Sequence, residues 1–210
     1  MRGTRRAIAT GAAVLMALVA PRAEASSSSD ELVRQARNHE AAHEEDLAAR
    51  RYTEALVLDP ASADAWLGLA SVRLRLGETA EAERVYAAAL ERIPSLSVAR
   101  ARRARVRWAL GRHAEAETDL EAYADERGDD AALRQLADWY GQDGRTPAQL
   151  AVWRRLLASA TRAGDLQAAH EAERMVRALV VVVDSADPAS SPAFADDTRR
   201  ALARIAARGR

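Results

Sequence analysis

The chain has 210 residues, with 31 basic and 31 acidic side chains, a single phenylalanine and no cysteine. Only 10 glycines and 6 prolines interrupt an alanine-rich sequence, a composition typical of helices and unlike that of a β-sandwich or β-barrel. The lack of cysteine excludes a disulfide scaffold and a thiol nucleophile. Because the charges balance, there is no electrostatic basis for binding nucleic acid.

Residues 1–25 have the three parts of a secretory signal peptide. Arginines within the first six residues precede an apolar run over 7–20, and a small-residue cleavage pattern ends at Ala25. The run is shorter than the ~20 residues that a membrane span needs, and Pro21 is expected to end its helix, so a retained anchor is the less favoured alternative. We expect a periplasmic or secreted protein, whose remaining 27 arginines and 30 acids give a net charge of −3.

A period of 34 residues runs through the rest of the sequence. Small, aromatic and turn-forming residues return at this step in several columns, which indicates a repeat architecture. The matching positions are Ala36, Ala70 and Ala104; Ala48, Ala82 and Ala116; Tyr52, Tyr86 and Leu120; Ala55 and Ala89; Gly77 and Gly111; and Pro60 and Pro94.

Each period is predicted to fold as a pair of antiparallel helices. It contains two segments with apolar residues at helical spacing, joined by a glycine-containing turn and closed by proline. The alanines allow two helices to cross closely, while Tyr52, Tyr86 and Leu69 fill the space beside them. Ser62 and Asp64 are candidate N-caps for the helix that follows. Since one pair cannot bury both of its faces, the pairs must stack on one another.

These residues resemble the tetratricopeptide repeat family. The match is best over residues 63–96, where the family's characteristic columns are occupied by Trp66, Leu69, Ala70, Gly77, Ala82, Tyr86, Ala89 and Pro94. The resemblance implies an all-α fold, a right-handed α-solenoid of about four repeats. The expected units are repeats over 29–62, 63–96, 97–130 and 130–164, followed by an end helix over 165–182.

The third repeat departs from the family pattern. It carries Arg100, Arg103 and Arg107 at positions where the family usually has large apolar residues. Two arrangements are open for this helix. Either the long arginine stems cover apolar surface while their charged ends reach water, or the helix is rotated relative to its counterparts.

The C-terminal segment differs from the repeats in composition. Residues 183–191 form a Ser/Pro/Ala/Asp-rich linker, and residues 192–210 are predicted to form a basic amphipathic helix. We expect this helix to pack back on the apolar end of the solenoid and to bury the valine run over 180–183. The alternative is a membrane-surface scaffold that binds anionic lipid through the same helix.

The sequence His39-Glu40-Ala41-Ala42-His43 is the strongest sign of an enzyme. On a helix this pattern places two imidazoles one turn apart, able to bind zinc, with the glutamate as general base. The repeat frame offers another interpretation, since His43 falls in the turn column of Gly77 and Gly111. We predict a solvated repeat turn, no cofactor and no catalysis; a small zinc hydrolase is the alternative. His113 and His170 are expected on the surface.

In the resembling family, the first helix of each pair lines a concave groove that holds peptides. The resemblance places nine residues of this chain there: Arg37, Leu67, Ser71, Leu74, Arg75, Arg102, Arg105, Trp108 and Arg134. Arginine can bind carboxylates bidentately, and Leu74 and Trp108 supply apolar anchors. The prediction is therefore a non-catalytic adaptor of the bacterial envelope that binds another protein, through an acidic segment or a free C-terminus.

Overall fold

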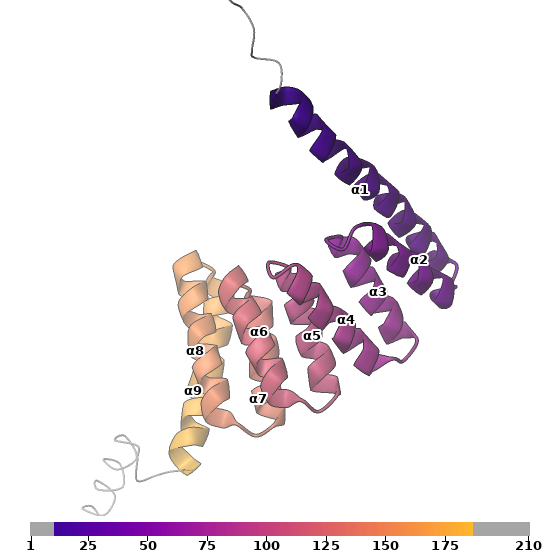
Figure 1. The fold of residues 1–210 in the computed structure, drawn as a ribbon. Helices are drawn as coiled ribbons and strands as arrows, with labels where there is room; N and C mark the ends of the chain where they lie inside the picture. The colour runs from indigo at the N-terminus through magenta and orange to yellow at the C-terminus, as the bar shows by residue number, and fades with distance from the viewer. Residues whose placement is uncertain (1–10, 187–210) are drawn as a thin grey trace, which may run out of the picture. The chain divides into compact units, whose positions relative to one another are not determined.

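The computed structural model describes the backbone of residues 11–186 and the side chains of residues 26–185. These residues form helices joined by short turns, without a strand among them (Figure 1). The helices are α1 (Gly11–Ala41), α2 (Glu45–Leu58), α3 (Ala63–Arg75), α4 (Thr79–Arg92), α5 (Ser97–Ala109), α6 (His113–Arg127), α7 (Asp130–Gln142), α8 (Thr146–Ala163) and α9 (Leu166–Ala186). The fold is an all-α repeat solenoid, as the sequence predicts.

Two helices extend beyond the segments expected from sequence. Helix α1 continues through Pro21, where its helix was expected to end, because one missing backbone hydrogen bond does not stop a long helix. Helix α9 continues to Ala186 and includes the start of the predicted linker. The predicted helix over 192–210 lies outside the described residues. None of the helices in the described part of the chain is long and apolar enough to cross a membrane.

The turn inside each helix pair repeats with the period of the sequence. His43, Gly77 and Gly111 all have left-handed backbone, with φ of 59°, 76° and 75°. After each of them, the next residue's amide donates to a carbonyl five residues back, from Glu44 to His39, from Glu78 to Arg73 and from Arg112 to Arg107, always at 2.9 Å. The interpretation of His43 as a turn residue is confirmed. Of these three positions, only His43 has a side chain, so only there does the positive φ cost free energy.

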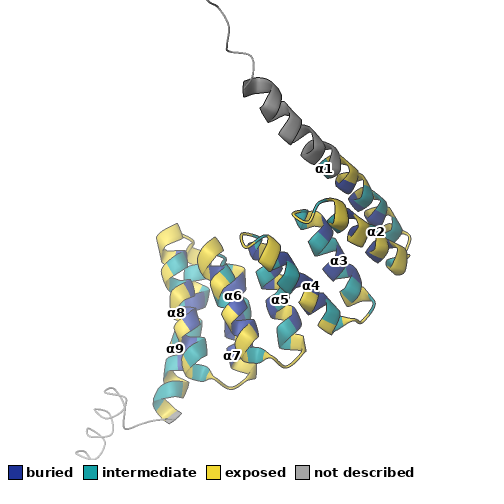
Figure 2. Cartoon of the chain, in the orientation of Figure 1, coloured by how far each residue is buried: buried dark blue, intermediate teal, exposed yellow. Residues whose placement is uncertain are grey.

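The chain divides into two compact units, residues 1–119 and residues 120–210. In the first, α1 to α4 each pack on the next helix along the chain. Buried positions lie on each of these helices (Figure 2). The core contains the alanine columns, which are fully buried at Ala36, Ala48, Ala70, Ala82, Ala104 and Ala116. Tyr52 and Tyr86 are 2% and 1% exposed and fill the space beside them. A Cβ on Gly68 would lie 2.2 Å from Tyr52 Cζ, so only glycine leaves room for that ring.

The second unit, in which α7 packs on α8 and α8 on α9, has a core of larger side chains. Leu136, Trp139, Trp153 and Leu156 are buried between these helices. Helix α9 buries little, however, and Val181 and Val182 are 64% and 51% exposed. The valine run is therefore only partly covered by the described residues; the C-terminal helix that was expected to bury it lies outside them.

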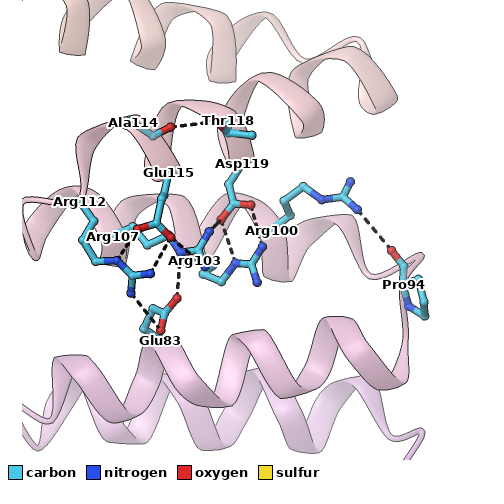
Figure 3. A network of polar contacts seen from close by, with 10 residues as sticks. All are labelled: Glu83, Pro94, Arg100, Arg103, Arg107, Arg112, Ala114, Glu115, Thr118 and Asp119. Carbon is cyan, nitrogen blue, oxygen red and sulfur yellow. Dashed lines mark hydrogen bonds and ion pairs between the residues drawn. The ribbon is translucent and has the colours of Figure 1, made fainter.

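The arginine-rich helix α5 is packed by an ion-pair network within the first unit (Figure 3). Asp119 of α6 accepts two bonds from Arg103, at 2.7 and 2.8 Å, and one from Arg107, at 2.9 Å. Arg107 also donates to Glu83 of α4 at 2.8 Å. The side chains of Asp119 and Arg107 are only 7% and 14% exposed. Arg103 and Arg107 therefore do not extend into water, because carboxylates buried on both flanking helices neutralise them. Arg100 donates to the Pro94 carbonyl at 3.5 Å. The helix is not rotated, since Ala104 is fully buried like Ala70.

Candidate functional site

Eight of the nine predicted groove residues lie on the first helices of the pairs in the first unit. Arg37 is on α1, four residues are on α3, and Arg102, Arg105 and Trp108 are on α5. Arg134 belongs to α7 in the second unit, where it donates to Glu171 of α9 at 3.2 Å.

A pocket of about 400 Å³ brings four of these residues together between α3 and α5. Ser71 and Leu74 come from α3, and Arg102 and Arg105 come from α5. The remaining lining residues are Thr79, Tyr86, Val106 and Ala109. The pocket therefore combines apolar walls with two guanidinium groups, a composition suited to a carboxylate that has an apolar neighbour.

Arg102 and Arg105 are exposed, and neither forms an ion pair with a carboxylate of the described residues. The Arg102 guanidinium lies beside the hydroxyl of Tyr86, a buried residue. Burial raises the pKa of Tyr86 above its ordinary value, and the neighbouring Arg102 opposes that rise. Tyr86 therefore remains a neutral hydroxyl at physiological pH and leaves the positive charge of Arg102 uncompensated.

The two other predicted groove arginines of the first unit are already paired inside the chain. Arg75 donates two bonds of 2.7 Å to Glu45 and lies 3.1 Å from Glu40. Hydrogen bonding to Arg75 lowers the pKa of Glu45, which keeps this pair ionised. Arg37 donates to Asp64 at 2.8 Å. This end of the groove is therefore close to neutral, and the uncompensated positive charge is confined to α5.

Trp108 is held away from the pocket. Its indole stacks on the imidazole of His113, with ring centroids 3.9 Å apart and an interplanar angle of 13°. Trp108 is half-buried and does not line the pocket, so the apolar contacts available to a ligand come from Leu74, Val106 and Ala109.

The residues that match a known family lie in this same region. Residues 39–102 match the family model described as tetratricopeptide repeat. This segment of the chain consists of tetratricopeptide repeats. The matched segment includes α2, α3 and α4 and thus one side of the pocket. Among proteins with curated descriptions, no sequence matches the chain.

Solved structures with tetratricopeptide repeats share this fold. The first repeat domain of Spaghetti (RPAP3), bound to the HSP90 peptide SRMEEVD, is 24% identical to this chain, with a TM-score of 0.52. The match covers 57% of this chain and 95% of the RPAP3 chain. A crystal structure of MamA is 17% identical with a TM-score of 0.58, covering 65% and 81%. A tetratricopeptide repeat protein from Parabacteroides merdae is 19% identical with a TM-score of 0.57, covering 78% and 68%.

Sequence reasoning missed the acids that neutralise the groove and part of the pocket lining. Glu40 and Glu45 flank the first repeat turn, and Asp64 was expected only as an N-cap. The cap of α3 is instead Ser62, whose hydroxyl accepts from the amide of Ala65 at 3.4 Å. Tyr86 could have been found, because a tyrosine that fills the space beside the first helices can reach the groove with its hydroxyl.

The geometry does not support the zinc-site alternative. Helix α1 ends at Ala41, so His39 and His43 do not share one helical face. His39 Nδ1 lies 2.6 Å from Glu44, and Glu40 pairs with Arg75. Within the described residues there is no group of three or more histidine, cysteine or acidic side chains placed to hold a metal ion.

Proposed function

We propose that this chain is a non-catalytic protein-interaction module whose pocket between α3 and α5 binds an acidic peptide segment or a free C-terminal carboxylate. The observation that carries the proposal is the pair Arg102 and Arg105, which line a partly apolar pocket without a carboxylate partner among the described residues. Guanidinium groups bind carboxylates through two parallel hydrogen bonds, which gives both affinity and orientation.

The apolar side of the pocket defines the rest of the ligand. Leu74 is 38% exposed and faces Val106 and Ala109 across the pocket. An apolar ligand side chain seated there would be removed from water while the neighbouring carboxylate meets the arginines. The ligand is therefore a segment in which an apolar residue adjoins an acidic residue or the chain end. A domain of the same fold holds a peptide of this type, the HSP90 peptide SRMEEVD.

The internal ion pairs of Arg37 and Arg75 indicate which helix binds the acidic end of the ligand. Because Asp64, Glu45 and Glu40 already occupy these guanidinium groups, a ligand carboxylate would have to displace a carboxylate of the chain to bind them. The arginines of α5 require no such displacement. We therefore place the acidic end of the ligand on α5, not on α1.

A peptide titration tests this function. Fluorescence anisotropy would compare a labelled peptide ending in an apolar residue and aspartate with its C-terminally amidated, asparagine-containing analogue. The expected result is loss of at least about tenfold in affinity for the analogue and for the double variant Arg102→Ala/Arg105→Ala, since charged hydrogen bonds are removed. The matched control, Arg34→Ala/Arg51→Ala, removes two arginines elsewhere and should bind like the parent. Equal binding by all three proteins would contradict the proposal.

We also propose that the module acts in the bacterial envelope after export. The proposal rests on the charged start, the apolar run over 7–20 and the small residues that end at Ala25. Mass spectrometry of the protein recovered from its own cells would give the N-terminus. A mature chain that starts at Ser26 supports export, and a chain that retains residues 1–25 in the cytoplasm contradicts it.

A further inference from the structure

A second groove lies between α2 and α4, where it exposes part of α3. Three pockets of about 590, 340 and 280 Å³ form it. The first two share Thr53 and Arg73, and the first and third share Pro60 and Arg92, so the three are continuous. None of the lining residues belongs to the pocket between α3 and α5.

The middle of this groove is apolar. Leu56 and Val57 of α2, Leu69 of α3 and Val85 of α4 line it, and Val57 is 77% exposed. Trp66 adds its ring, with the indole N–H donating to the Pro60 carbonyl at 2.9 Å. Its polar atom is thus satisfied, and the ring leaves an apolar surface toward the groove.

The positions that line this groove have counterparts 34 residues later in the chain. There, charged side chains fill the corresponding space. A shift of 34 residues converts Leu69 into Arg103 and Arg73 into Arg107. The same shift relates two groove residues to carboxylates, Val85 to Asp119 and Ala49 to Glu83. Around α5 these charged residues form the buried network (Figure 3). At the matching positions around α3 the arginine is present as Arg73, and both carboxylates are missing.

Arg73 shows the consequence of that loss. It donates from Nη1 to Glu78 at 2.6 Å, but its Nε is buried without a hydrogen-bond partner among the described residues. The matching Nε of Arg107 donates to Glu83 at 2.8 Å. Arg92, at the other end of the groove, is exposed and has no carboxylate partner in the described part of the chain. A buried donor without a partner is costly, and a carboxylate would satisfy it.

We infer that the α2–α4 groove is a second docking site, for a segment of another protein that presents an apolar side chain beside a carboxylate. The apolar side chain lies on Leu56, Leu69 and Val85. The carboxylate accepts from Arg73 and takes the place that Glu83 and Asp119 occupy around Arg107. The occupant is acidic because Arg50, Arg73 and Arg92 lack a complete set of carboxylate partners among the described residues. Two acids of the groove, Glu81 and Glu54, are already paired with Arg84 and Arg51.

Selection from a phage-displayed library of short random peptides tests this site. The bait is the full chain carrying Arg102→Ala/Arg105→Ala, so that ligands of the pocket between α3 and α5 do not dominate. The expected outcome is enrichment of sequences with an acidic residue near a large apolar one. No enrichment, or enrichment of sequences without acids, would overturn the inference. Because the bait lacks the first pocket, this result is independent of the proposed function above.

Two variants then locate the bound peptides. Ala49→Glu/Val85→Asp copies the filled space of the next repeat and should abolish binding of the selected peptides. Arg73→Gln leaves a polar side chain but removes the guanidinium charge, and should weaken binding of the peptides about tenfold or more. Circular dichroism checks that both fold. Undiminished binding by either folded variant would refute the site, and self-association of the parent that the double variant abolishes would assign the groove to a second copy instead.

Discussion

The substitution Asp119→Ala should cost the protein about 3 kcal/mol of its free energy of unfolding. The carboxylate accepts three charge-assisted hydrogen bonds, two from Arg103 and one from Arg107, of 2.7 to 2.9 Å. Breaking a buried pair from one side typically costs about 3–5 kcal/mol, because the remaining charge loses its partner without returning to water. The lower end applies because Arg107 keeps Glu83 at 2.8 Å, whereas the described residues offer Arg103 no other carboxylate.

Urea denaturation followed by far-ultraviolet circular dichroism measures this cost. The control is Asp64→Ala, whose partner Arg37 is 57% exposed, and it should change the unfolding free energy by less than about 1 kcal/mol. Arg103→Leu/Asp119→Val, which copies Leu69 and Val85 of the preceding repeat, should recover most of the loss, since apolar side chains can replace a buried pair. A cost below about 1 kcal/mol for Asp119→Ala, or a double variant no more stable than the single one, would refute the reasoning.

Four further changes test other parts of the structure. His43→Gly should stabilise the fold by about 1 kcal/mol in thermal unfolding, by relieving the positive φ; a destabilised variant would contradict this. Gly68→Ala should destabilise it by ~1–3 kcal/mol, since the new Cβ overlaps the Tyr52 ring; no loss would show that the ring can move away. Ser62→Ala should cost about 1 kcal/mol through the lost N-cap of α3, and an unchanged denaturation midpoint would count against the cap. Tyr52 and Tyr86 have raised pKa values, so they should ionise only above the pH at which unfolded tyrosine does. The folded state should lose stability as pH rises above about 10, which absorbance at 295 nm and unfolding at high pH check.

The periodicity of the sequence predicted the features that depend on backbone geometry. A small residue is needed wherever two helices cross, so the alanine columns predicted which positions form the core. The six alanines of the first two columns are all fully buried. The turn column predicted a turn at His43, and the backbone there is left-handed although histidine disfavours that conformation. Pro60 and Pro94 indicated the ends of α2 and α4, each of which ends two residues earlier. These features repeat because each unit must present the same surface to its neighbour.

The side-chain pairings could not be predicted in the same way. Asp119 and Glu83 lie on different helices from Arg107. One period earlier the matching positions hold Val85 and Ala49, so the repeat pattern does not indicate this pairing. Whether a long guanidinium turns toward a carboxylate of the next helix depends on rotamers and on what the flanking positions hold, and a single sequence does not specify either. Arg75 is a second example. The groove pattern predicted that it contacts a ligand, whereas in the structure it forms ion pairs with Glu45 and Glu40.

The most direct test of the central claim is isothermal titration of the purified chain with a peptide that ends in an apolar residue and aspartate. We expect stoichiometric binding that weakens at least about tenfold for Arg102→Ala/Arg105→Ala and remains unchanged for Arg34→Ala/Arg51→Ala. Binding that is the same for all three proteins, or no binding by the parent, would contradict the assignment of the pocket between α3 and α5 as the interaction site.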